Sequence, residues 1–412
     1  MKKLSFLVLT VLLFHACTPM DNPRVPLYGI TLDKENLSIG FGTTYKLNAS
    51  VTPERTTDKL ILVWESDDPS IVEVDQDGVL RGKEHGDAII SVTATLSGKS
   101  YTATCTVEVI PVVVNIPDEV FRNYCLQIAD FNDDGILTSD ETVLIKTILI
   151  GGLGVASLDG IQFFSEIEHL NCANNQLTVI DLSQNTALLF LFCSNNKLTA
   201  LNLSQNRALR RLECFVNQLT SLDVSENTAL ERLSCYNNQL SSLDVSHNTV
   251  LERLNCDMNK LTVLDVSHNN ALTVLDCANN LLTTLDVSQN TLLRAFYCEN
   301  NQLTALDCSQ NGVLIQLTCD NNLLISLDVS GCTALQTLSC CDNNLTTLDL
   351  NHNTELQLLV CQLNLFTSLD LSHNLDLTTA YCSINSLLTE IWLKIGQSLY
   401  INKDSQTVIN YK

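Results

Sequence analysis

The sequence predicts a mainly β protein, in which a β-sandwich is followed by a solenoid of stacked coils with a short helical cap at its entrance. Three observations lead to this prediction. Residues 166–389 repeat with a strict period of 21, residues 25–111 alternate apolar and polar side chains between turn signals, and residues 112–165 combine one helical pattern with an acidic loop. Repetition at such a period is typical of solenoids, and regularly spaced alternating segments are typical of sandwiches.

Residues 1–17 predict an export signal. Two lysines precede the apolar run Leu4–Phe14, which is too short to span a membrane as a helix. The pair formed by Ala16 and Cys17 resembles the end of a lipobox, in which the cysteine is lipid-modified and becomes the first mature residue. The resemblance implies lipidation at Cys17 and an outer-membrane lipoprotein at the cell surface, with a secreted protein as the alternative. Residues 18–24 then form a tether.

Residues 25–111 predict an all-β domain. Alternating segments such as Ala88–Ala94 and Ala103–Val109 are separated by turn residues at the spacing of a sandwich. The run Val63–Asp75 contains Trp64, for which we expect a place in the core. This run is similar to the bacterial Ig-like domain of group 2. The resemblance implies a spacer that lifts the repeats off a surface, and carbohydrate binding is a minority interpretation.

Residues 112–165 predict the cap of the solenoid. Ile116–Ile128 has helical period and an acidic first turn, and residues 130–141 match D-x-[DN]-x-[DN]-G-x5-E at every fixed position. Calcium prefers six or more oxygen ligands, which this spacing supplies. The expected ligands are Asp130, Asn132, Asp134, the backbone carbonyl of Ile136, and Glu141. The motif resembles a single EF-hand, and we expect calcium to brace the entrance of the solenoid. The alternative is a loop that keeps its shape without metal.

The repeats at 166–389 share the pattern L-x-x-L-x-C-x-x-N-x-L, as in Leu230–Leu240. In a strand carrying L-x-C, leucine and cysteine point to one side, and stacking at about 4.8 Å places each on its equivalent in the next coil. The asparagine is expected to turn the chain and to bond neighbouring coils, because its amide donates and accepts. The second half of the unit, as in Leu243–Asn248, continues the core and supplies turns. We expect extended or 3₁₀ segments on the outer side.

Eleven of the 17 cysteines form one ladder, from Cys172 to Cys382. We expect buried, reduced thiols, because stacked side chains run parallel and do not converge as disulfides or zinc ligands do. A 21-residue leucine-rich repeat with a cysteine ladder is similar to the internalin-J-like group of bacterial surface proteins. The resemblance covers over half the chain and implies a binding surface without naming a ligand. Residues 390–412 predict a capping hairpin after eleven coils.

The outward positions of the predicted strands form a concave face that is free of core constraints. Aromatic rings beside arginines on such a surface are typical of binding hot spots. The candidate ligand-binding residues are Phe190, Phe192, Arg211, Phe215, Arg232, Tyr236 and Arg253. The three arginines recur one period apart, so their like charges require compensation, either from Glu213, Glu231 and Glu252 or from an acidic ligand. Packing of the rings on one another is the alternative to a role in binding.

Composition limits the classes of function. A net charge of −23 argues against a nucleic-acid partner. The sequence has no glycine-rich phosphate loop, H-E-x-x-H motif or nucleophile elbow, so no enzyme is expected. We therefore predict a monomeric, non-catalytic adhesion protein that binds a protein or glycan through its concave face. A polysaccharide-capture component for nutrient uptake and a structural envelope protein are the alternatives.

Overall fold

The computed structural model describes residues 26–54, 60–96 and 98–412, which belong to two compact units. One unit ends at Val112 and the other begins at Val113. The predicted export signal, including Cys17, lies outside the described residues. Within the described ranges, no helix has the length and apolar character needed to cross a membrane.

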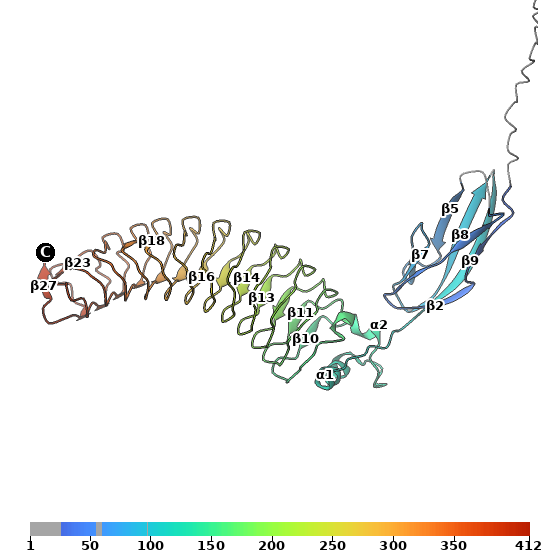
Figure 1. The fold of residues 1–412 in the computed structure, drawn as a ribbon, viewed down its shortest axis with the longest axis horizontal. Helices are drawn as coiled ribbons and strands as arrows, with labels where there is room; N and C mark the ends of the chain where they lie inside the picture. Colours follow the sequence, from blue (N-terminus) through green and yellow to red (C-terminus); the bar gives the residue numbers. More distant parts are fainter. Residues whose placement is uncertain (1–25, 55–59, 97) are drawn as a thin grey trace, which may run out of the picture. The chain divides into compact units, whose positions relative to one another are not determined.

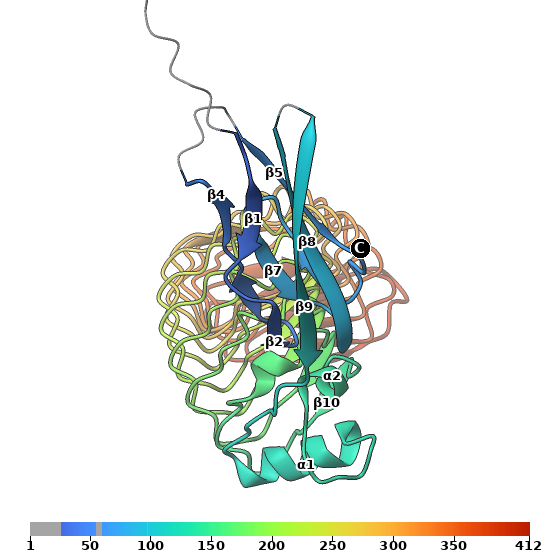
Figure 2. The same cartoon turned by 90° about the vertical axis from the view of Figure 1, so that its right-hand side faces the viewer.

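The first unit is a β-sandwich, as predicted, and its long strands β8 and β9 are clear in Figure 2. Trp64 is only 4% exposed and lies in the core between the sheets, where the sequence placed it. The largest sheet has the order β2 (Asn36–Gly40), β9 (Lys99–Ile110), β8 (Gly86–Leu96), β5 (Ile61–Ser66). The others are β3 (Thr44–Lys46), β7 (Val79–Gly82), β6 (Val72–Val74), and β1 (Gly29–Leu32) with β4 (Ala49–Thr52).

A helical segment opens the second unit. Helix α1 (Glu119–Ala129) begins after Asp118, whose carboxylate accepts hydrogen bonds from Phe121 N at 2.9 Å and Ala156 N at 2.8 Å. Asp118 therefore caps the helix and also ties it to the first coil. The buried ring of Phe121 lies 6.3 Å from that of Phe164. Helix α2 (Ser139–Thr142) follows the acidic loop, and η1 (Ile161–Phe163) leads into the repeats.

The rest of this unit is a solenoid that follows a curved path, with its main sheet on the inner side (Figure 1). One three-residue strand per coil joins a parallel sheet of 13 strands. In order these are β10 (Thr147–Leu149), β11 (His169–Asn171), β12 (Phe190–Phe192), β13 (Arg211–Glu213), β14 (Arg232–Ser234), β15 (Arg253–Asn255), β16 (Val274–Asp276), β17 (Ala295–Tyr297), β19 (Gln316–Thr318), β21 (Thr337–Ser339), β22 (Leu358–Val360), β24 (Thr379–Tyr381) and β26 (Tyr400–Asn402).

The other side of the coils is extended rather than helical. Two short parallel sheets form there: β18 (Ala305–Asp307) with β20 (Ser326–Asp328), and β23 (Ser368–Asp370) with β25 (Glu390–Leu393) and β27 (Val408–Tyr411). This agrees with the extended form of the two outer conformations that the short repeat predicted.

The cysteine ladder lies inside the solenoid, as predicted. Leu233 and Cys235 of one coil are 1% and 0% exposed, and their equivalents form one continuous core. None of the cysteines in the described ranges forms a disulfide. Burial raises the pKa of Cys235 to about 12, so its thiol stays protonated and unreactive at neutral pH.

The first asparagine row satisfies its amides fully. In one coil, Nδ2 of Asn280 donates to the Cys256 carbonyl of the preceding coil at 3.0 Å and to the Cys277 carbonyl of its own coil at 3.1 Å. Its Oδ1 accepts from Leu261 N at 3.0 Å. The row therefore bonds coil to coil through buried donors and acceptors, as the sequence indicated.

A second asparagine row is only half satisfied. Nδ2 of Asn290 donates to the carbonyls of Val266 and Asn269 at 3.0 Å each. Its buried Oδ1 has no hydrogen-bond partner among the described residues, and the same holds for the equivalent atoms from Asn185 to Asn374 in most coils. The two rows thus differ in the number of hydrogen bonds that each asparagine side chain forms.

The prediction of a C-terminal hairpin is wrong. Strands β25 and β27 run parallel to β23, and β26 runs parallel to β24. Residues 390–412 therefore prolong the solenoid, and β10 extends it at the other end, so the main sheet exceeds the predicted eleven coils. The reason is that main-chain bonding does not require the leucine and cysteine pattern. Ile391 stacks on Leu369 one residue later than the period predicts.

Candidate binding surface

Strands β11 to β17 bury their central residue and direct the first and third residues to the outer face of the sheet. Each predicted ligand-binding residue lies on this face, either on the strands or directly after the ladder cysteine, and is half-buried or exposed. The face is therefore set by the repeat itself, because alternation within each strand fixes which side chains reach solvent.

The aromatic side chains on this face stack in pairs. The rings of Phe215 and Tyr236 are 4.3 Å apart and nearly parallel at 8°, and the rings of His169 and Phe190 are 4.6 Å apart at 17°. These partners sit on adjacent coils, so the ring faces point along the solenoid and the ring edges point outward. The alternative that the rings pack on one another thus describes these pairs. Sequence reasoning missed His169, although its place three residues before Cys172 marks it.

The arginine row is in register, with Arg211 opposite Arg232 and Arg232 opposite Arg253. Arg211 lies 5.1 Å from the centre of the Phe192 ring, and its Nε donates to Glu213 at 3.0 Å. Among the described residues, Arg232 and Arg253 form no ion pair, and both are exposed.

The interpretation that glutamates of the chain neutralise the arginine row is therefore correct for Arg211 only. Glu213 neutralises Arg211, as one interpretation required. Glu231 instead pairs with Arg210, which stands outside the row, and Glu252 pairs with no cation within the described ranges. The expectation that Glu231 and Glu252 neutralise the row is wrong, because both precede their strands by one residue and leave the sheet's outer face.

A cavity of about 240 Å³ opens on the same face. Its charged and aromatic lining consists of Arg211, Glu213, Arg232, Arg253, Asp276 and Tyr297. Sequence reasoning did not include Asp276 and Tyr297 in the site, although both are third residues of their strands and face outward by the same period.

Carboxylates gather where the arginine row ends. Burial, together with the charges of Asp276 and Glu299, raises the pKa of Asp257 to about 6. Burial also raises the pKa values of Asp276 and Glu299. Residues 295–393 contain neither lysine nor arginine. The face therefore changes from cationic to anionic along the solenoid.

The residue two positions after each ladder cysteine adopts a left-handed backbone conformation. Six of these eleven positions hold asparagine, which tolerates this conformation. Val216 and Met258 hold it at φ of 52° and 50°, and Leu363 and Ile384 hold it at 56° and 61°, where a β-branched or bulky residue is strained. Met258 is 50% exposed. Core packing and turn chemistry do not explain Val216 and Met258, which flank the Phe215 and Tyr236 pair.

The acidic loop before α2 is held by its own carboxylates. Asp130 accepts from Gly135 N at 2.9 Å, Asp134 accepts from Ile136 N at 2.7 Å, and Glu141 accepts from Phe131 N at 3.1 Å and from Thr138. In the described part of the chain, no three Asp, Glu, His or Cys side chains converge as metal ligands. The expected ligands of the loop are nevertheless all oxygen atoms, which calcium prefers. The Glu141 carboxylate also holds Phe131 at the start of the loop and Thr138 near its end.

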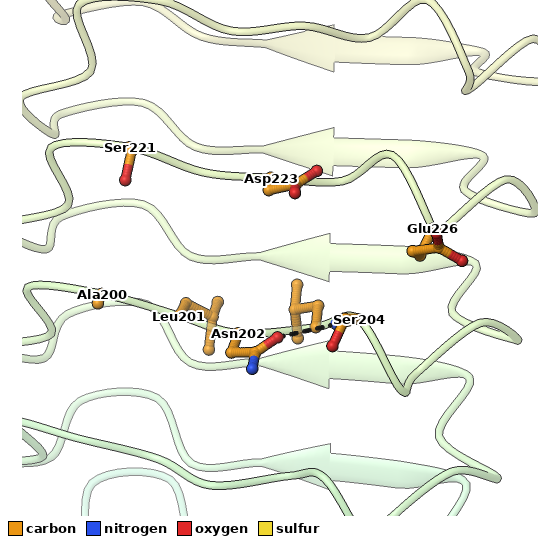
Figure 3. A pocket seen from close by; sticks show the side chains of 8 residues that line it. Ala200, Leu201, Asn202, Ser204, Ser221, Asp223 and Glu226 are labelled. Carbon is orange, nitrogen blue, oxygen red and sulfur yellow. Dashed lines mark hydrogen bonds between the residues drawn. The ribbon is translucent and has the colours of Figure 1, made fainter.

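A second cavity, of about 220 Å³, lies on the side of the coils away from the main sheet (Figure 3). It is lined by Asn202, Ser204, Asp223 and Glu226 among others, and Asn202 Oδ1 accepts from Ser204 N at 3.1 Å. These residues close turns between coils, so the cavity is accounted for by the repeat.

Known proteins resemble both units. Residues 27–107 match the bacterial Ig-like domain (group 2). An uncharacterized protein of Clostridium acetobutylicum is 39% identical over 95 residues, which span 23% of this chain and 23% of that relative. The functional domain of InlJ from Listeria monocytogenes, which includes a cysteine ladder, is 33% identical with a TM-score of 0.64, and the match covers 72% of each chain. The L. monocytogenes internalin InlF is 21% identical with a TM-score of 0.52, covering 73% of this chain and 97% of that one, and shares the fold.

Proposed function

Because the chain belongs to the internalin-like leucine-rich repeat proteins with a cysteine ladder, which indicates a non-catalytic interaction role, we propose that it is an adhesion protein of the bacterial surface that binds its ligand through the outer face of the main sheet. The observation that carries the proposal is the patch formed by Phe192, Arg211, Phe215, Tyr236 and Met258. These side chains are half-buried or exposed on one face, and the core does not require them.

The patch has the composition of a protein-binding hot spot. Aromatic and arginine side chains contribute most to binding where they bury large surfaces with few rotamers to fix. Stacking pre-orders Phe215 on Tyr236, and the guanidinium of Arg211 covers Phe192. Ordering before contact reduces the entropy that binding costs.

Binding is expected to fall about 30-fold or more when Phe192, Phe215 and Tyr236 are replaced together by alanine, since a single hot-spot residue already contributes about 2 kcal/mol or more. The wild-type protein and the triple variant would be compared on arrays of surface proteins and of glycans. A matched control replaces Val179 and Val263, which are 68% and 69% exposed away from the sheet, by alanine. Unchanged binding in the triple variant, with an unchanged circular dichroism spectrum, would contradict the proposal. Glycan-only binding would instead support the polysaccharide-capture alternative.

We further propose that calcium binds the loop Asp130–Glu141 and braces the entrance of the solenoid. Asp118 and Phe121 already tie α1 to the first coil, so a metal held by the next twelve residues would stiffen that junction. Calcium at about 100 times its dissociation constant is expected to stabilise the protein by about 2.7 kcal/mol. Thermal melts with calcium, magnesium or a chelator would measure the shift.

The control for this experiment keeps the loop's hydrogen bonds. Replacing Asp130 and Asp134 by asparagine retains acceptors for the Gly135 and Ile136 amides but removes two charges. The calcium shift should disappear in this variant while the melt in chelator stays close to wild type. An equal calcium shift in both proteins would place the ion elsewhere and remove the site.

A further inference from the structure

We propose that the cavity beside Arg232 and Arg253 binds a single acidic side chain presented by an extended segment of a partner protein. The inference rests on the proposed function and gives it a ligand chemistry. Its starting point is an electrostatic imbalance on the outer face of the main sheet. The chain carries 46 acidic and 23 basic residues, yet two exposed arginines stand in register without an ion pair in the described residues.

Adjacent strands place the two arginines about 5 Å apart at the backbone, where their like charges repel. A carboxylate has two oxygens, and each can accept from a different guanidinium, which converts the repulsion into two charge-assisted hydrogen bonds. Arg211 shows the same chemistry within the chain, because Glu213 occupies its donors. Arg232 and Arg253 are thus the two members of the row whose donors remain for a ligand.

The size and charge of the cavity favour one carboxylate rather than a polyanion. Its volume of about 240 Å³ suits a group the size of a side chain. Asp276 lines the same cavity, as does Glu213, which is paired with Arg211, and the charges of Asp276 and Glu299 act on Asp257, so a second negative charge further along the face would be repelled. Sulfated polysaccharides and nucleic acids carry charges at every unit and do not fit this arrangement.

The neighbouring surface favours a polypeptide over a sugar. A sugar ring stacks on the face of an aromatic ring, but Phe215 and Tyr236 turn their faces to each other and their edges outward. Val216 and Met258 add aliphatic surface directly beside these edges. A peptide with one acidic side chain flanked by aliphatic or aromatic side chains would place its charge on the arginines and its apolar groups on the neighbouring rings and aliphatic side chains. An extended peptide can also run across the strands of the face.

Selection from a displayed library of random dodecapeptides tests the inference. We expect the enriched peptides to share one Asp or Glu flanked by apolar residues. Replacing Arg232 and Arg253 together by glutamine should weaken their binding about 30-fold or more, as loss of a charge-assisted pair predicts. The control replaces Arg207 and Arg294, exposed arginines outside the strands, by glutamine and should bind as wild type. Binding of a peptide in which the acid is changed to its amide should fall by a similar factor.

The outcomes separate the inference from the proposed function. Peptides enriched without an acidic residue, or bound equally by the arginine variant, would overturn the inference, and loss of their binding in the Phe192, Phe215 and Tyr236 variant would leave the proposed function standing. No enrichment at all would overturn the assignment to an extended segment. Binding of glucuronate oligosaccharides that depends on Arg232 and Arg253 would assign the carboxylate to a sugar and equally overturn the protein source.

Discussion

Replacing Asn280 by alanine is expected to lower the free energy of unfolding by about 4 kcal/mol, because three buried backbone groups lose their partners. These are the carbonyls of Cys256 and Cys277 and the amide of Leu261, which bond to the two ends of the side-chain amide. Each unsatisfied buried group costs about 1–3 kcal/mol. Chemical denaturation followed by circular dichroism would measure the change.

Asn290→Ala is the matched comparison, because it removes a buried asparagine from the second row. It removes one hydrogen bond from each of the carbonyls of Val266 and Asn269, which keep the backbone donors Asn269 N and Leu272 N at 3.0 Å, and it also removes the Oδ1 atom that has no partner among the described residues. We therefore expect a loss of about 2 kcal/mol. Equal losses in the two variants would show that the hydrogen-bond count does not set the difference between the rows.

The second large effect is expected at a coil that departs from the repeat. Cys332 replaces the asparagine of the second row, and its Sγ donates to the Cys308 carbonyl at 3.1 Å. The thiol is shorter than the amide, and the backbone lies correspondingly closer to the preceding coil. A Cβ built on Gly331 would stand 1.7 Å from the Ser309 carbonyl oxygen. Glycine is thus required at this position because the backbones meet there.

Gly331→Gln, which introduces a residue that other coils carry at this position, is expected to destabilise the chain by about 3 kcal/mol or more, since backbone rather than a flexible side chain must yield. Adding Cys332→Asn should recover most of this loss, because the longer amide allows the usual spacing between coils. Denaturation of both single variants and the double variant gives the coupling energy. Additive losses would show that the two residues do not depend on each other.

Much of the fold follows from the sequence because one unit is repeated. A single coil such as residues 230–250 determines which side chains are buried, and stacking extends the result to every other coil. The 21-residue period does not predict the ends of the solenoid. Ile391 stacks where the period places residue 390, and the strands continue to pair without the leucine and cysteine pattern. Helix α1 begins at Glu119, three residues after the apolar pattern starts, because Asp118 caps it.

The candidate surface was predictable in position but not in detail. Alternation placed Phe192 and Arg232 on the outer face, yet it does not specify rotamers, so the ring pairs and the choice of Glu213 rather than Glu231 as an ion partner emerged only from the structure. Asp276 was not predicted as a site residue, because it follows the coils that carry Phe192, Phe215 and Tyr236. Its strand position is nevertheless equivalent to that of Phe192. The period predicts which residues can meet a ligand, and side-chain packing decides which of them have donors left.

The asparagine rows and short strands join each coil only to its two neighbours, and this has a mechanical consequence. Traction on one end loads the outermost coil first, and a released coil transfers the load to the next. One coil holds 21 residues, which extend to about 70 Å when pulled straight, against the roughly 5 Å that it occupies in the stack. A tethered chain under flow would therefore lengthen in discrete steps and dissipate work at each one.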